Sequence, residues 1–339
     1  MMHELTDIIY QSLLWQQKGI RSVLATVVAL HGSSYRKPGV RMLISEDGQA
    51  IGAVSGGCVE KEIINRSTAV FQTGQPLMMT YDGRYRLGCE GTLYILIEPV
   101  HISTDLEQRF AQCISERESL TITSYFKSLD DYSHSSLGSV IKFESGATFH
   151  FNPENSPSDQ NEQFEQELKP RFRLIIIGGE HDTVALCTLA SNMGWEVEVI
   201  TSIKEAKRME HFPGATSVTG QTPETFTLNS SDEQTAIVLM THNFSLDLRY
   251  LIALYDQSAS FSYLGILGAM KRRNELINQF LEHRNDAFEL AEQIHAPAGL
   301  NIGAITPQEI SISILAEILS VTRNTNSLPL ALINDKIHA

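Results

Sequence analysis

Apolar residues in the first third of the chain repeat with the period of a helix and then with that of strands. Between residues 4 and 17 they return at helical spacing, and residues 22–30 then form a β-branched run typical of a buried strand. Residues 41–54 carry two apolar runs around an Asp-Gly pair, which tolerates the positive φ of a hairpin turn. A second strand pair is expected between residues 80 and 98.

The pattern weakens in the middle of the chain. From about residue 101 to 170 apolar residues become sparse, although two segments still alternate like exposed strands. Residues 152–163 are polar and contain proline, which is typical of a linker. We therefore expect an N-terminal α/β domain over residues 1–150 and a linker over residues 151–170.

Beyond the linker, strands and helices alternate. Residues 171–202 predict a strand, a glycine turn, a helix and a second strand, and two further apolar runs are each followed by a helical pattern. Three residues predict the start of a final helix: Thr306 at the N-cap, Pro307 in the first turn and Glu309, whose side chain reaches back to the N-cap. This alternation predicts a Rossmann-like domain with a parallel sheet over residues 171–325, followed by a tail over 326–339.

Composition narrows the possible functions. The 339 residues carry a formal net charge of −14, and no cluster of lysine or arginine makes a local exception, so nucleic acid is a poor candidate partner. The apolar runs are far shorter than the roughly 20 residues needed to span a bilayer. Four scattered cysteines suit a reducing compartment. We expect a cytoplasmic protein without membrane segments.

The sequence SGGCVE, residues 55–60, places two glycines and a thiol where a strand gives way to a helix. A sharp glycine turn leaves backbone N–H groups unpaired at the helix start, where they and the helix dipole attract anions. The same field favours a thiolate at Cys58. An anion site beside a reactive thiol is one interpretation. The other is a tight turn in which Cys58 packs as a small apolar residue.

A second thiol lies between glycines in the sequence LGCEG, which contains Gly88 and Cys89. Arg84 and Arg86 lie in the same loop. Four residues of an earlier loop could pair with a phosphate or simply face solvent: Tyr35, Arg36, Lys37 and Arg41. Two such thiols in one domain favour a shared small-molecule pocket. Cys113 and Cys187 lie in helical patterns and are expected in the core.

The C-terminal domain carries only part of a dinucleotide-binding motif. Gly178 occupies the first glycine position, but Glu180 stands at the second and Thr183 at the third. The second strand ends without the acidic residue that usually binds the ribose, because Glu198 falls inside the strand. Both departures from the motif disfavour the binding of NAD(P).

Histidines follow two of the expected parallel strands. His181 comes after the first strand and His242 after a later one, at the carboxyl ends where such sheets bind ligands. A lone histidine there is more often structural, although two on neighbouring strand ends favour function slightly. No third ligand accompanies them, so we predict no metal site.

Taken in order, these segments resemble the XdhC/CoxI family, the accessory factors of molybdenum hydroxylases such as xanthine dehydrogenase. The resemblance covers most of residues 20–322 and is weakest between about 101 and 165. It is carried by the segments GSSYRKPGVRMLI, GAVSGGCVEKEI, YDGRYRLGCEGTLYILIEP, LIIIGGEHD, VLMTHN, LGILG and PAGLNIGAITPQEISISILAEI.

The resemblance implies a non-enzymatic protein that binds molybdenum cofactor (molybdopterin) as cargo, keeps it available for sulfuration and delivers it to an apo molybdenum hydroxylase. It also implies contact with a cysteine desulfurase and pairing into a homodimer. Positions matching the family motifs or lying beside them are the candidate cofactor-binding residues: Ser55, Gly56, Gly57, Cys58, Glu60, Gly88, Cys89, Gly178, Gly179, His181 and His242.

Three positions depart from the family pattern: Glu90 and Glu180 each replace a usual glycine, and Thr201 or Ser202 replaces a usual aspartate. Two other functions stay open. One is an NAD(P)-dependent oxidoreductase with a degenerate motif, which the departures at Glu180 and Thr201 disfavour. The other is a sulfurtransferase that carries a persulfide on Cys58 or Cys89.

Overall fold

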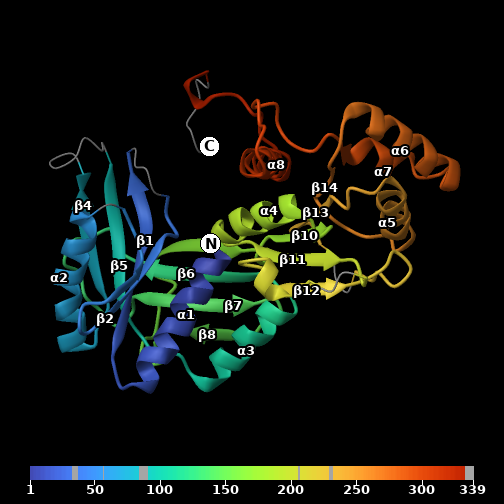
Figure 1. Ribbon diagram of the computed structural model, residues 1–339. Coiled ribbons are helices and arrows are strands. Elements are labelled where there is room, and N and C mark those ends of the chain that lie inside the picture. Colours follow the sequence, from blue (N-terminus) through green and yellow to red (C-terminus); the bar gives the residue numbers. More distant parts are fainter. Residues whose placement is uncertain (33–36, 56, 84–90, 205–206, 229–231, 333–339) are drawn as a thin grey trace. The chain divides into compact units, whose positions relative to one another are not determined.

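The computed structural model describes residues 1–32, 37–55, 57–83, 91–204, 207–228 and 232–332. The chain folds as two compact units, residues 1–170 and residues 171–339 (Figure 1). Each unit is described by itself. None of the helices in the described ranges is long and apolar enough to cross a membrane.

Unit 1, residues 1–170, is built first around a five-stranded antiparallel sheet in the order β3-β2-β1-β5-β4. Its strands are β1 (Ser22–His31), β2 (Arg41–Ser45), β3 (Ala50–Gly52), β4 (Leu77–Asp82) and β5 (Thr92–Val100). The predicted hairpin is confirmed as β2 and β3, and the predicted strand pair as β4 and β5.

Helix α2 (Cys58–Thr73) covers one face of this sheet, and helix α1 (Met2–Gln17) packs on the other (Figure 1). The alternation of β1 explains the two faces: Val23, Ala25 and Val27 join the core with α2, whereas Leu24 joins the core with α1. The strand that the β-branched run predicted is therefore buried on both sides.

A second antiparallel sheet in unit 1 has the order β8-β7-β6-β9 and is covered by α3 (Thr104–Ser115). Its strands are β6 (Leu120–Phe126), β7 (Gly138–Phe143), β8 (Thr148–His150) and β9 (Glu162–Leu168). We expected β6, β7 and β8 to be exposed. Every second side chain of β6 is instead buried, because the sheet shares one core with α1 and α3.

The segment 151–170, expected as a linker, differs from that expectation. Its last part forms β9, which pairs with β6 along its whole length from Glu162 to Leu168, and unit 1 extends to Pro170. The segment has the polar composition of a linker because most side chains of β9 face solvent. Backbone hydrogen bonds nevertheless hold β9 in the sheet.

A small group of polar side chains is buried in unit 1. Glu98 of β5 is fully buried and accepts hydrogen bonds from the N–H and the hydroxyl of Ser139 at 2.8 and 2.5 Å. Burial raises its pKa from an ordinary 4.5 to about 7. Arg41, also buried, donates to Gln166 of β9 at 2.6 Å, which ties the two sheets together.

Unit 2, residues 171–339, contains a six-stranded, fully parallel sheet in the order β12-β11-β10-β13-β14-β15. Its strands are β10 (Arg173–Ile177), β11 (Glu196–Thr201), β12 (Ser217–Gly220), β13 (Thr235–Leu239), β14 (Tyr263–Ile266) and β15 (Ile294–His295). The order reverses between β10 and β13, which is the topological switch point of a doubly wound fold.

Helices cover both faces of this sheet (Figure 1). On one face pack α4 (His181–Asn192) and α8 (Pro307–Thr322), and on the other α5 (Phe244–Asp256), α6 (Met270–His283) and α7 (Phe288–Gln293). Thr306 and Glu309 form the predicted capping box of α8. The predicted fold class, an N-terminal α/β unit followed by a Rossmann-like unit, is confirmed.

Candidate functional site

The turn before α2 is fixed by the apolar residues on either side of it. Val54 and Val59 are buried in the core beneath α2, so the residues between them must bend outward. Gly57 takes a φ of +42° at the N-cap, a conformation that a side chain disfavours. Cys58, the first residue of α2, is consequently exposed to solvent. The alternative of a packed Cys58 does not hold in this structure.

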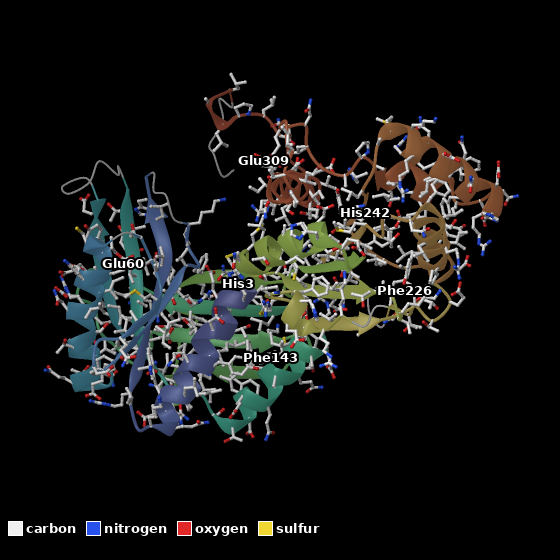
Figure 2. The ribbon with its side chains drawn as sticks, in the orientation of Figure 1. His3, Glu60, Phe143, Phe226, His242 and Glu309 are labelled. Atoms are coloured by element: carbon white, nitrogen blue, oxygen red, sulfur yellow. The ribbon has the colours of Figure 1, made fainter. Side chains whose placement is uncertain are left out.

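The side chain of Glu60 accepts a backbone hydrogen bond within this turn. The Ser55 N–H donates to Glu60 Oε1 at 2.7 Å, while Oε2 is buried without a hydrogen-bond partner among the described residues (Figure 2). The Ser55 amide, expected to attract an anionic ligand, is thus occupied by the chain's own carboxylate. The amides of Cys58 and Val59 meet no acceptor within the described ranges, so N–H donors lie beside the thiol in the same turn as the Glu60 carboxylate.

The two other described thiols differ from Cys58. Cys113 and Cys187 are buried, as predicted, and burial raises the pKa of each to about 11. Gly56, Gly88 and Cys89 lie outside the described residues, as do Tyr35, Arg36, Arg84, Arg86 and Glu90. In the part of unit 1 that the structure describes, Cys58 is therefore the thiol accessible to a ligand.

Unit 2 has its own glycine turn, between β10 and α4. Gly178 has a φ of +144°, and a Cβ built on it would lie 2.3 Å from the carbonyl oxygen of Met240. Only glycine fits this close approach of the β10 turn to the end of β13. The hydroxyl of Thr183, the residue at the third motif position, donates to the Gly178 carbonyl at 3.1 Å and steadies the turn.

The side chains of Lys207 and Glu180 lie at the part of this turn that follows Gly178. Lys207 Nζ donates to the Gly179 carbonyl and lies 3.9 Å from Glu180 Oε1. Glu180 is the N-cap residue of α4, is exposed, and makes no capping hydrogen bond with its side chain. The position where a second glycine would admit a pyrophosphate is therefore occupied by an acid and a lysine.

The two histidines predicted at the strand ends have different surroundings. His181 is exposed at the first position of α4, whereas His242 Nε2 lies 3.4 Å from Asp182 Oδ2 (Figure 2). His242 has a φ of +56°, which turns the chain at the end of β13. Among the described residues no three potential ligands come together to hold a metal.

A cavity of about 360 Å³ opens beside the Gly178 turn, at the carboxyl ends of β10, β11, β12 and β13. Sequence reasoning located this edge and named Thr201, but it missed Lys207, Gln221 and Arg249, because they are distant in sequence and follow no motif. Glu198, already expected inside β11, pairs with Arg173 at 3.4 Å and lies away from the cavity lining.

These features define a class: a two-unit α/β protein with an accessible thiol at a helix start in one unit and a Rossmann-type cavity in the other. Residues 174–318 match the XdhC Rossmann domain, and residues 15–82 match the XdhC and CoxI family. The chain belongs to the XdhC/CoxI family.

Known proteins resemble the chain over nearly its whole length. A Bacillus subtilis protein named as a probable xanthine dehydrogenase subunit is 28% identical, covering 89% of this chain and 93% of the relative. The molybdenum cofactor insertion chaperone PaoD of Escherichia coli is 26% identical, covering 89% and 84%. A crystal structure described as a xanthine dehydrogenase from Bacillus halodurans superposes with a TM-score of 0.76 at 26% identity, covering 95% of this chain and 98% of the other.

Proposed function

We propose that this protein binds molybdenum cofactor and supports its insertion into a xanthine dehydrogenase-type molybdenum enzyme. The observation that carries the proposal is the exposed thiol of Cys58 at the start of α2. The relative named as a molybdenum cofactor insertion chaperone supports the same role. Molybdenum cofactor has a phosphate and a dithiolene-bound metal, so a thiol beside amides that meet no acceptor in the described ranges is suited to hold it.

Each residue of the turn has a distinct task in this proposal. Gly57 permits the bend, Glu60 fixes the backbone of Ser55, and Cys58 supplies the sulfur that contacts the cargo. Cys89, outside the described residues, is a second candidate contact. Binding and release need no bond-making step by the chain, so the proposed role is that of a carrier.

The proposal is tested by cofactor retention. The full chain, loaded with molybdenum cofactor, is passed through gel filtration, and bound cofactor is measured by its fluorescent oxidation product. Cys58→Ser should reduce the retained cofactor about tenfold, since it removes the sulfur contact. Cys113→Ala, which removes a buried thiol of the same unit, serves as the matched control and should retain cofactor. Equal retention by wild type and Cys58→Ser would contradict the role of Cys58.

Support for sulfuration is a finer part of the proposal and has its own test. If Cys58 or Cys89 carries sulfur, incubation with a cysteine desulfurase and cysteine should add one sulfur atom to the peptide that contains it. Mass spectrometry of the wild type and of the Cys58→Ser and Cys89→Ser variants identifies the residue. An unmodified wild type removes the sulfur-carrier function and leaves cargo binding intact. The expected cytoplasmic location and homodimer stay predictions; light scattering tests the dimer.

A further inference from the structure

The cavity at the carboxyl ends of β10–β13 has polar atoms that the fold leaves unused. Thr201 is buried, with a relative exposure of 2%, lines the cavity, and its hydroxyl has no hydrogen-bond partner among the described residues. The side-chain oxygen of Gln221, Oε1, is likewise buried, lines the same cavity and has no partner there. Such orphaned atoms cost about 1–3 kcal/mol each in a closed protein interior. A ligand that satisfies them would recover this energy.

The two orphaned atoms belong to neighbouring strand ends. The Gln221 N–H donates to the Thr201 carbonyl at 3.0 Å, which holds the two residues side by side. The Gln221 Nε2 group donates to Thr219 Oγ1 at 3.3 Å, and this orients Oε1 as a pure acceptor. Thr201 can donate or accept. A hydroxyl and an acceptor in the lining of one cavity match the hydroxyl groups of a ribose.

Cations line the cavity in a chain that is strongly acidic as a whole. Lys204 is exposed, and Lys207 lies over the Gly179 carbonyl at the opening of α4. Arg249, also in the lining, pairs with Glu224, and Lys207 lies 3.9 Å from Glu180. Lys204 and Lys207, both in the lining, favour an anion such as a phosphate at this end of the cavity.

The size of the cavity and its blocked turn restrict the ligand further. About 360 Å³ is near the lower end of the roughly 300–1,000 Å³ typical of small-molecule sites. Glu180 and Lys207 occupy the path that the pyrophosphate of a dinucleotide would take. Leu246 and Tyr250 of α5 are part of the lining and offer apolar surface for a base.

We propose that this cavity binds a ribonucleoside monophosphate, with its ribose hydroxyls on Thr201 and Gln221 and its phosphate on Lys204 and Lys207. The inference rests on unit 2 alone and does not depend on cofactor binding at Cys58. It also differs from NAD(P) binding, since no diphosphate crosses the Gly178 turn.

Calorimetry on the full chain tests the proposal with adenosine 5′-monophosphate, its cytidine, guanosine and uridine counterparts, the 2′-deoxy forms and adenosine. At least one ribonucleoside monophosphate should bind, about tenfold more tightly than its 2′-deoxy form. Thr201→Val keeps the shape and removes the orphaned hydroxyl, so it should fold normally and lose this preference. If wild type binds none of the four at 1 mM, or binds ribo and deoxy forms equally, the proposal is overturned.

The phosphate contact has a separate readout. Lys207→Ala should weaken binding of the monophosphate about tenfold and leave binding of the nucleoside unchanged, whereas Lys271→Ala, an exposed lysine at the start of α6, should change neither. Equal weakening of nucleoside and nucleotide by Lys207→Ala would indicate a structural effect and overturn the assignment. Binding of NADP without binding of any monophosphate would overturn it as well.

Discussion

The two glycine turns of this protein look alike in sequence and differ in structure. Both follow a strand and open a helix, at Gly57 before α2 and at Gly178 before α4. At Gly57 none of the described atoms lies within 4 Å of where a Cβ would be, whereas at Gly178 the backbone of Met240 lies against it. The first turn presents a thiol to solvent, and the second joins two strands at the wall of a cavity. A glycine turn in the sequence therefore predicts a bend, whereas its function depends on the residues packed around it.

The largest effect should come from adding a methyl group to each turn. Gly178→Ala forces a Cβ to within 2.3 Å of the Met240 carbonyl at a φ that alanine avoids, so it should lower the free energy of unfolding by at least about 3 kcal/mol. Gly57→Ala meets none of the described atoms and carries only the backbone penalty of its φ of +42° and ψ of −53°, about 1–3 kcal/mol. Urea unfolding of both variants measures the difference. Equal losses would show that the two turns are constrained alike.

A buried acid of unit 1 should make the stability of the protein depend on pH. Glu98 accepts hydrogen bonds from the N–H and the hydroxyl of Ser139. The pKa of Glu98 is raised by burial from 4.5 to about 7, so its protonated form favours the fold. Its contribution is full below about pH 4.5 and is lost as pH rises through 7.

The loss should amount to about 2–3 kcal/mol between pH 4.5 and 7.5. Glu98→Gln keeps the shape of the side chain and removes the titration, so this part of the slope should disappear from a series of unfolding curves. Glu107→Gln, at an exposed acid on α3 of the same unit, is the control. A slope that is unchanged in Glu98→Gln would contradict the assignment.

Thiol reactivity compares one exposed position with two buried ones. In a Cys89→Ser background, Cys58 should be alkylated by iodoacetamide at least roughly 50-fold faster than Cys113 or Cys187 at pH 7.5. Burial blocks access to the latter two and raises the pKa of each to about 11. Peptide mass spectrometry over time gives the three rates. Comparable rates would place Cys58 in the core and remove it from the proposed site.

The smallest effect concerns the glutamates of the two turns. Glu60→Ala removes the acceptor of the Ser55 N–H and should cost about 1 kcal/mol, with faster hydrogen exchange at Ser55. Glu180→Ala removes an exposed side chain that makes no cap hydrogen bond, so it should change stability by less than about 0.5 kcal/mol. If both cost the same, Glu60 does not stabilise its turn.

The sequence alone determined the main elements and the class of unit 2. Apolar runs followed by helical periods are local, so strands β10, β11, β13 and β14, the capped α8 and the buried Cys113 and Cys187 could be predicted from neighbours along the chain. The short strands β12 and β15 have no such pattern and were not predicted. The same local pattern failed for β9, because its place in the sheet comes from backbone pairing with β6 rather than from apolar side chains.

Tertiary structure decided what each turn can bind. Whether the Ser55 amide is free depends on Glu60, and whether Gly178 has room depends on Met240, which is far away along the chain. The pairing of Thr201 with Gln221 and the approach of Lys207 to Gly179 likewise arise only when distant strands end at one edge. Packing of distant segments sets the space, the charge and the unused hydrogen bonds of a site, and none of these is a property of local sequence.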